Sequence, residues 1–92
     1  MGKIVDLKAL EKVLKSLANN RRLKILRVLK KEKRCSVGYI AEEIELSFKS
    51  TSRHLAVLYN ADIVEKTQKG LEVYYYLKSN FKTGSIEVLT IL

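Results

Sequence analysis

The stretch from Ser47 to Ala61 carries the side chains best suited to chemistry with a polyanion. It contains no Asp or Glu, and its polar groups are hydroxyls, an amide, an imidazole and cations. At helical spacing its apolar side chains form a seam that would face a core. That seam consists of Phe48, Thr51, Leu55 and Leu58. The opposite face and its flanks carry Lys49, Ser50, Ser52, Arg53, His54, Ala56 and Asn60.

This acid-free face predicts a helix that lies against nucleic acid. A helix face that only meets water commonly pairs Glu with Lys at i,i+4 spacing, and this one does not. Hydroxyl groups can bond phosphates or base edges, and an Arg can bond guanine through two hydrogen bonds. Ser47 is a suitable N-cap. The positive end of the helix dipole would then lie at the end of the helix that approaches the nucleic acid. We call the segment from Ser47 to Ala61 the reading helix. The predicted DNA-binding residues of this helix are Ser47, Lys49, Ser50, Ser52, Arg53 and His54.

Composition favours the same class of partner. The chain has 92 residues, a formal net charge of +8 and a pI of about 9.7, which points to nucleic acid first and an anionic membrane surface second. The alternative is that the positive net charge only keeps the protein soluble and does not indicate a polyanionic partner. Cys35 is the single cysteine, so no intrachain disulfide is possible, and no apolar run approaches a membrane span. We expect one domain, residues 1–92, in the cytoplasm.

Amphipathic periodicity predicts three helices before the reading helix. They are expected at Ile4–Leu17, at about Arg21–Lys31 after the two candidate cap residues Asn19 and Asn20, and in a short segment that Ser36 caps. The segment from Lys30 to Arg34, between the second and third helices, is expected to be a charged turn. Only Glu45-Leu46-Ser47 separates the third helix from the reading helix, so these two form a predicted helix-turn-helix pair. The glutamates of the third helix should then face away from phosphate.

The period changes from helical to alternating after Asp62. Ile63 to Thr67 and Leu71 to Leu77 are two predicted strands, joined by a hairpin in which Gly70 supplies a positive φ. In the second strand, Leu71, Val73, Tyr75 and Leu77 share one face. This hairpin is a predicted wing. Its tip and margin carry three residues for backbone or minor-groove contact, Lys66, Gln68 and Lys69.

Two further cations stand at the start of the second helix. Arg21 and Arg22 oppose the helix dipole there unless an anion is nearby, which predicts a phosphate clamp. A simple solvated pair of arginines is the alternative.

The pattern as a whole predicts an α+β, mostly α, winged helix-turn-helix of three to four helices and a two-stranded wing. Residues 79–92 are mostly apolar and β-branched at their end, so they must dock against protein, as a helix or as a strand. Residues 1–18 and 79–92 are the expected dimerisation segments.

Several segments resemble the ArsR family of bacterial and archaeal repressors. Residues 17–26 resemble the start of the family's second helix, and residues 50–58, with their Ser-Arg-His-Leu core, resemble its recognition helix. Residues 61–66, 69–70 and 75–77 fit its wing. The resemblance covers about residues 7–77. It implies a homodimer, joined through the first helix and the C-terminal segment, that places two reading helices in successive major grooves of an imperfect palindrome.

The sequence departs from the metal-responsive members of that family. Those members carry paired cysteines at positions matching Ser36 and Gly38, or His and acid clusters on a C-terminal helix, and this chain has neither. Asn20 stands where the family usually has proline. Cys35 is one residue out of register and His54 is the lone histidine, so we expect no metal site, no cofactor and no catalytic residues.

The sequence therefore supports a sequence-specific, double-stranded DNA-binding regulator, acting as a homodimer and repressor. One alternative is a winged-helix adaptor that docks protein within transcription or replication machinery. Another is a protein that coats nucleic acid without discriminating sequence. The alternative for the polar residues of the reading helix is that they only contact solvent and do not bind DNA.

Overall fold

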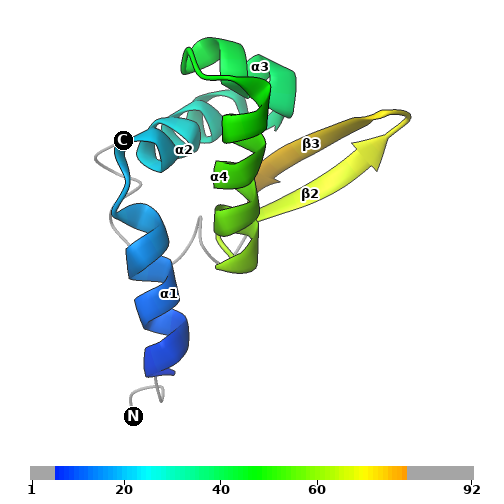
Figure 1. Cartoon of the computed structure of the whole chain (residues 1–92). Coiled ribbons are helices and arrows are strands. Elements are labelled where there is room, and N and C mark those ends of the chain that lie inside the picture. Colours follow the sequence, from blue (N-terminus) through cyan, green and yellow to red (C-terminus); the bar gives the residue numbers. More distant parts are fainter. Residues whose placement is uncertain (1–5, 79–92) are drawn as a thin grey trace.

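The computed structural model describes residues 6–78, which form four helices and a three-stranded sheet. In chain order the elements are α1 (Leu7–Leu17), α2 (Asn20–Glu32), β1 (Arg34–Ser36), α3 (Val37–Glu43), α4 (Phe48–Asn60), β2 (Val64–Lys69) and β3 (Glu72–Leu77). Helix α4 lies between the other helices and the hairpin β2–β3, while α1 and the hairpin project from the body in different directions (Figure 1). The predicted winged helix-turn-helix is confirmed.

Side-chain caps fix where the helices begin. The predicted caps Asn19, Ser36 and Ser47 each accept a hydrogen bond from the backbone N–H three residues later, at 3.1–3.2 Å. Asp6 caps α1 by accepting hydrogen bonds from the amides of Lys8 and Ala9, two and three residues later. These bonds satisfy donors that the first helical turn cannot pair internally. Helix α1 therefore begins at Leu7, whereas the sequence predicted a start at Ile4, which lies outside the described residues.

The core forms where α4 packs on α2 and α3. The most deeply buried side chains come from every layer of the fold: Ile25, Leu26, Leu29, Ile40, Thr51, Leu55, Leu58, Ile63 and Val64. The strong periodicity of α2 and α4 produces this core, because residues three and four apart share one helix face. The predicted seam is confirmed for Thr51, Leu55 and Leu58.

The predicted seam is wrong at Phe48, because 62% of the surface of this residue is exposed to solvent. Phe48 is the first residue of α4 and is not among the buried core residues. It lines a groove of about 490 Å³ together with Ser52 and residues of β3. Leu71 also lines this groove, but it precedes β3 and is fully exposed, whereas the sequence predicted it on the same strand face as the buried Tyr75 and Leu77.

The sheet contains one strand more than the sequence predicted. Strand order is β1-β3-β2, with both pairs antiparallel, and Cys35 pairs with Tyr75 in the β1–β3 register. The segment from Lys30 to Arg34 was predicted as a turn, but α2 continues to Glu32 and Arg34 belongs to β1. A three-residue strand has no periodicity of its own and exists because β3 supplies its hydrogen-bond partners. The tip of the wing is at Gly70, with φ +61°, as predicted.

Helix α1 has an apolar face that the described residues leave uncovered. Leu7 and Leu14 are 74% and 54% exposed, and Leu10 is also exposed, whereas Leu17 is buried in the core. The other predicted dimerisation segment, residues 79–92, lies outside the described residues, as do residues 1–5. No helix within residues 6–78 is long and apolar enough to cross a membrane.

Thr51 provides a test of the core. Its hydroxyl is fully buried and finds no hydrogen-bond partner within residues 6–78. Replacing an unpaired buried hydroxyl by a methyl removes a desolvation penalty, so Thr51→Val should raise the free energy of unfolding by about 1 kcal/mol. Urea titration monitored by circular dichroism would measure this. Thr51→Ser keeps the hydroxyl and removes the methyl, so it should destabilise the protein; a loss of stability in both variants would contradict the packing described here.

Cys35 provides a test of the β1–β3 pairing. Burial, together with the nearby carboxylates of Glu32 and Glu43, raises the pKa of its thiol from 9.0 to about 11. The thiolate fraction near pH 8 should then be about 100-fold lower than in the unfolded chain, since each unit of pKa is a factor of ten. We expect iodoacetamide to alkylate the native protein at least that much more slowly than the urea-unfolded protein, as followed by mass spectrometry. Equal rates would show that β1 does not cover the thiol.

Candidate nucleic-acid interface

The outer face of α4 is exposed, cationic and free of acids. Lys49, Arg53, Ala56 and Asn60 recur at steps of four, three and four residues, so they share the face opposite the buried seam. All four are exposed. Leu55 and Leu58 are buried on the opposite side of the helix, so this face points away from the core. The small side chain of Ala56, next to the cation Arg53 on this face, allows the helix to approach a groove closely.

The serines of α4 occupy different positions. Ser47 Oγ accepts the amide of Ser50 as the N-cap, so its hydroxyl hydrogen remains able to donate to another group. Ser50 and Ser52 are half-buried. Ser52 lines the groove beside Phe48 and the wing. The predicted reading residues therefore span the first two turns of α4, but only Lys49 and Arg53 among them are fully exposed side chains with charge.

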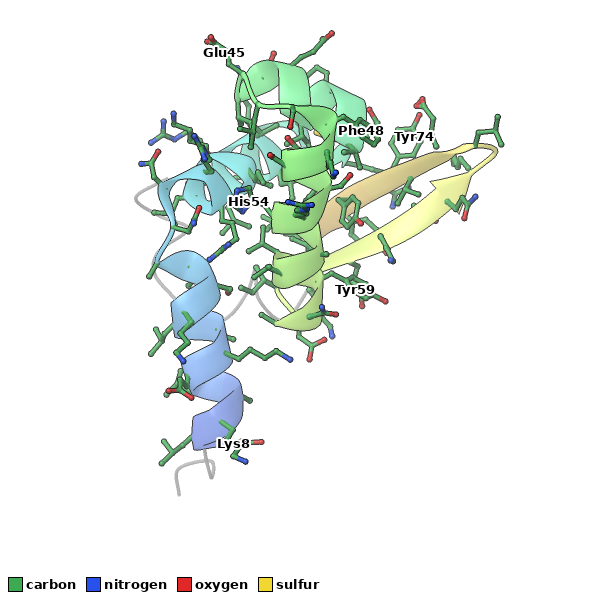
Figure 2. All side chains as sticks on the ribbon, in the orientation of Figure 1. Lys8, Glu45, Phe48, His54, Tyr59 and Tyr74 are labelled. Atoms are coloured by element: carbon green, nitrogen blue, oxygen red, sulfur yellow. The ribbon has the colours of Figure 1, made fainter. Side chains whose placement is uncertain are left out.

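Arg21 and Arg22, the predicted phosphate clamp, have different environments. Arg21 is exposed, whereas Arg22 is half-buried. The guanidinium of Arg22 donates to the backbone carbonyls of Ser16 and Lys15 at the end of α1 and lies 3.2 Å from Nδ1 of His54. In Figure 2, His54 projects from the middle of α4. The structure thus brings together two predicted DNA-binding residues, Arg22 and His54, through a contact with each other.

The environment of His54 favours a neutral imidazole. Partial burial lowers its pKa, and the positive charges of Arg22 and Arg21 lower the pKa further. The usual pKa of histidine is about 6.5, so the ring is uncharged at neutral pH. His54 therefore adds hydrogen-bonding capacity to α4 and not charge.

The three predicted DNA-binding residues of the wing, Lys66, Gln68 and Lys69, have different environments. The ammonium of Lys66 sits 4.5 Å from the ring centre of Tyr59, so the wing and the end of α4 make a cation–π contact. Gln68 donates its side-chain amide to the carbonyl of Gly70 and so helps to shape the hairpin tip. Lys69 is exposed beside that tip. Lys69 is therefore the wing cation best placed to meet a partner away from the body.

The acidic groups around the interface have different environments. Asp62 and Glu65, which follow α4, share the ammonium of Lys78 at 3.3 and 3.9 Å. The glutamates at the end of α3 are exposed, as the sequence predicted. The two acids that follow α4 are therefore each paired with a cation, whereas exposed Glu72 on β3 lines the groove beside Phe48 and Ser52.

Sequence reasoning missed a second group of polar side chains. Lys12 and Lys15 of α1 line a groove of about 260 Å³ together with Arg22 and Asn60, which brings α1 cations beside the end of α4. The spacing of the lysines on α1 shows that they share a face, but only the fold shows which helix that face meets. Within residues 6–78, no group of three or more His, Cys, Asp or Glu side chains could hold a metal ion.

Comparison with known sequences identifies the family. The family described as "Bacterial regulatory protein, arsR family" matches residues 19–66. The transcriptional activator HlyU of Vibrio cholerae is 38% identical over 77 residues, which make up 84% of this chain and 70% of that protein. The transcriptional repressor PagR of Bacillus anthracis is 31% identical over 77 residues, 84% of this chain and 77% of that protein.

Solved structures show the same fold. HlyU from Vibrio cholerae superposes with a TM-score of 0.74 at 33% identity, covering 84% of both chains. A homodimeric winged helix-turn-helix DNA-binding domain from Mycobacterium bovis superposes with a TM-score of 0.77 at 27% identity, covering 99% of this chain and 82% of that one. The chain therefore belongs to the ArsR family of bacterial regulatory proteins and is a winged-helix, DNA-binding transcription regulator.

Proposed function

We propose that this protein is a homodimeric repressor that binds a specific double-stranded operator with imperfect two-fold symmetry. The observation that carries this proposal is the outer face of α4, which is exposed, holds Lys49 and Arg53, and has no acid from Ser47 to Ala61. An α-helix of this width fits the major groove, where base edges differ among all four base pairs. Ser47, Ser50, Ser52 and His54 supply further donors on the same helix.

The wing and the first turn of α2 position the helix on the duplex. Lys69 at the hairpin tip and exposed Arg21 lie on elements that flank α4, where cations can meet backbone phosphates. Lys66 and Gln68 belong to the same proposed contact surface, although each also makes a contact within the protein. Contacts of this kind fix orientation and carry no sequence information.

The uncovered face of α1 supports a dimer. Leu7, Leu10 and Leu14 expose apolar surface along one helix, and the apolar end of residues 79–92 would add to it. A second copy that covers this face would place two α4 helices in a symmetric pair, as two-fold operators require. We propose residues 1–18 and 79–92 as the dimerisation segments of a single domain. The homodimeric domain from Mycobacterium bovis supports the same assembly.

We propose repression because it is the simplest regulatory outcome of a surface that binds DNA. Occupying an operator requires only DNA contacts, and the proposed contact residues of α4, α2 and the wing would be sufficient for these. We also propose that no metal ion regulates binding, because Ser36 and Gly38 occupy the positions of the paired cysteines in metal-responsive members. A protein-docking adaptor remains the competing function, and there the cations of α4 would be dispensable.

Two single substitutions test sequence reading by α4. After selection of bound fragments from random duplexes, Arg53→Ala should weaken binding to the selected site by about 1 to 3 kcal/mol and reduce discrimination against random DNA. Lys69→Ala, its matched control at a proposed phosphate contact, should weaken selected and random duplexes by the same factor. Fluorescence anisotropy at several salt concentrations would measure both. Equal effects of the two substitutions on random duplex would refute reading by α4, and unchanged binding in both would favour the adaptor.

Leu14→Glu tests the proposed dimer. Removing one buried leucine and burying a carboxylate at the interface should cost at least about 2 kcal/mol per protomer, so the variant should sediment as a monomer at micromolar concentrations. Lys8→Glu places the same side chain on α1 away from the apolar stripe and should remain dimeric. Sedimentation velocity would compare them. A dimer that survives Leu14→Glu would show that α1 is not the dimerisation surface.

A further inference from the structure

The side chain of Arg22 connects three segments of the fold. Its Nε donates to the Ser16 carbonyl at 2.6 Å and its Nη2 to the Lys15 carbonyl at 3.4 Å, both at the C-terminal end of α1. Its Nη1 lies 3.2 Å from Nδ1 of His54 on α4. Arg22 itself belongs to the first turn of α2. One guanidinium therefore joins α1, α2 and the recognition helix.

The contact with Arg22 determines which nitrogen of His54 carries the proton. A guanidinium has only donors, so Nδ1 of His54 must accept. Partial burial and the charges of Arg22 and Arg21 lower the pKa of His54, which keeps the ring neutral. A neutral imidazole with an accepting Nδ1 has its proton on Nε2. His54 is thus an Nε2–H donor, and no hydrogen bond found within residues 6–78 uses that donor.

The same contacts argue against Arg22 as a phosphate ligand. Three of its donors point to protein acceptors, and its side chain is half-buried, whereas neighbouring Arg21 is exposed. A guanidinium that is already bound to two carbonyls and an imidazole would have to break those bonds to reach a backbone phosphate.

We infer that Arg22 is a positioning residue for DNA binding, which ties the recognition helix to α1 and holds His54 as an Nε2–H donor for a backbone phosphate. This inference rests on the proposed function. It replaces the phosphate-clamp role that the sequence predicted for Arg22 and leaves that role to Arg21. It also connects the helix that we propose for dimerisation directly to the helix that we propose for reading.

The tautomer can be measured without DNA. His54 is the only histidine, so long-range ¹H–¹⁵N correlation spectra contain a single imidazole to assign. At pH 7.5 the wild type should show the Nε2–H form, and Arg22→Met should show a mixture of both tautomers. Arg21→Met, the matched control, also removes one positive charge but should keep the Nε2–H form. An Nδ1–H form in the wild type would overturn the inference.

The salt dependence of DNA binding separates positioning from phosphate contact. Each phosphate that a cation neutralises changes the slope of log affinity against log salt by about 0.9. Arg21→Met should reduce the slope by about that amount. Arg22→Met should leave the slope unchanged, yet lower affinity for the selected duplex roughly tenfold or more relative to random duplex. A slope that falls in Arg22→Met as it does in Arg21→Met would overturn the inference.

Two further variants distinguish loss of the link between Arg22 and His54 from a general folding defect. Arg22→Lys retains the charge, so a phosphate contact would largely survive it, whereas the three-way link would not; we expect selective loss of affinity for the selected duplex. Arg22→Met combined with His54→Gln should lose no more affinity than Arg22→Met alone, because the two residues act together. Additive losses would overturn the inference. Failure of the wild type to bind any duplex would instead overturn the proposed function, while the tautomer would still test the Arg22–His54 link.

Discussion

Burial of one face of α4 is the constraint on which the rest of the structure depends. Leu55, Leu58 and Thr51 are completely buried against a core that α2, α3 and the residues following α4 complete. A helix cannot rotate about its axis without exposing such a face, so the orientation of the opposite face is fixed as well. The exposed cations of α4 therefore point outward as a consequence of core packing. The chemistry of the interface is positioned by apolar residues that never contact a partner.

Local patterns in the sequence were sufficient to predict the helices, their caps and the wing. Asn19, Ser36 and Ser47 cap helices as predicted, because capping needs only a short polar side chain and the amide three residues later. The seam of α4 was predicted for a similar reason, since helical periodicity is local. Its error at Phe48 arose because periodicity says which face a residue occupies and not how far the core extends along the helix.

Features that depend on distant partners could not be predicted in this way. Strand β1 exists through pairing with β3, some forty residues later in the chain, and only its first residue, Arg34, lay in the segment predicted as a charged turn. The contact between Arg22 and His54 joins residues 32 positions apart. Sequence reasoning identified both residues as candidates for DNA binding but had no means of placing them against each other. Of the candidate site, residue types were therefore predictable, whereas the division of roles between neighbours was not.

The short strand β1 has a consequence for the shape of the target. It ends at Ser36, which caps α3, and it is paired with β3 of the wing, so the helix-turn-helix and the hairpin are built on a common sheet. Backbone hydrogen bonds thus hold the hairpin to β1 and so to α3, and a short turn joins α3 to α4. A DNA target must then present a groove to α4 and flanking backbone to the hairpin at a nearly constant separation. Lengthening that separation by one base pair would shift one contact by about 3.4 Å along the duplex and rotate it out of reach.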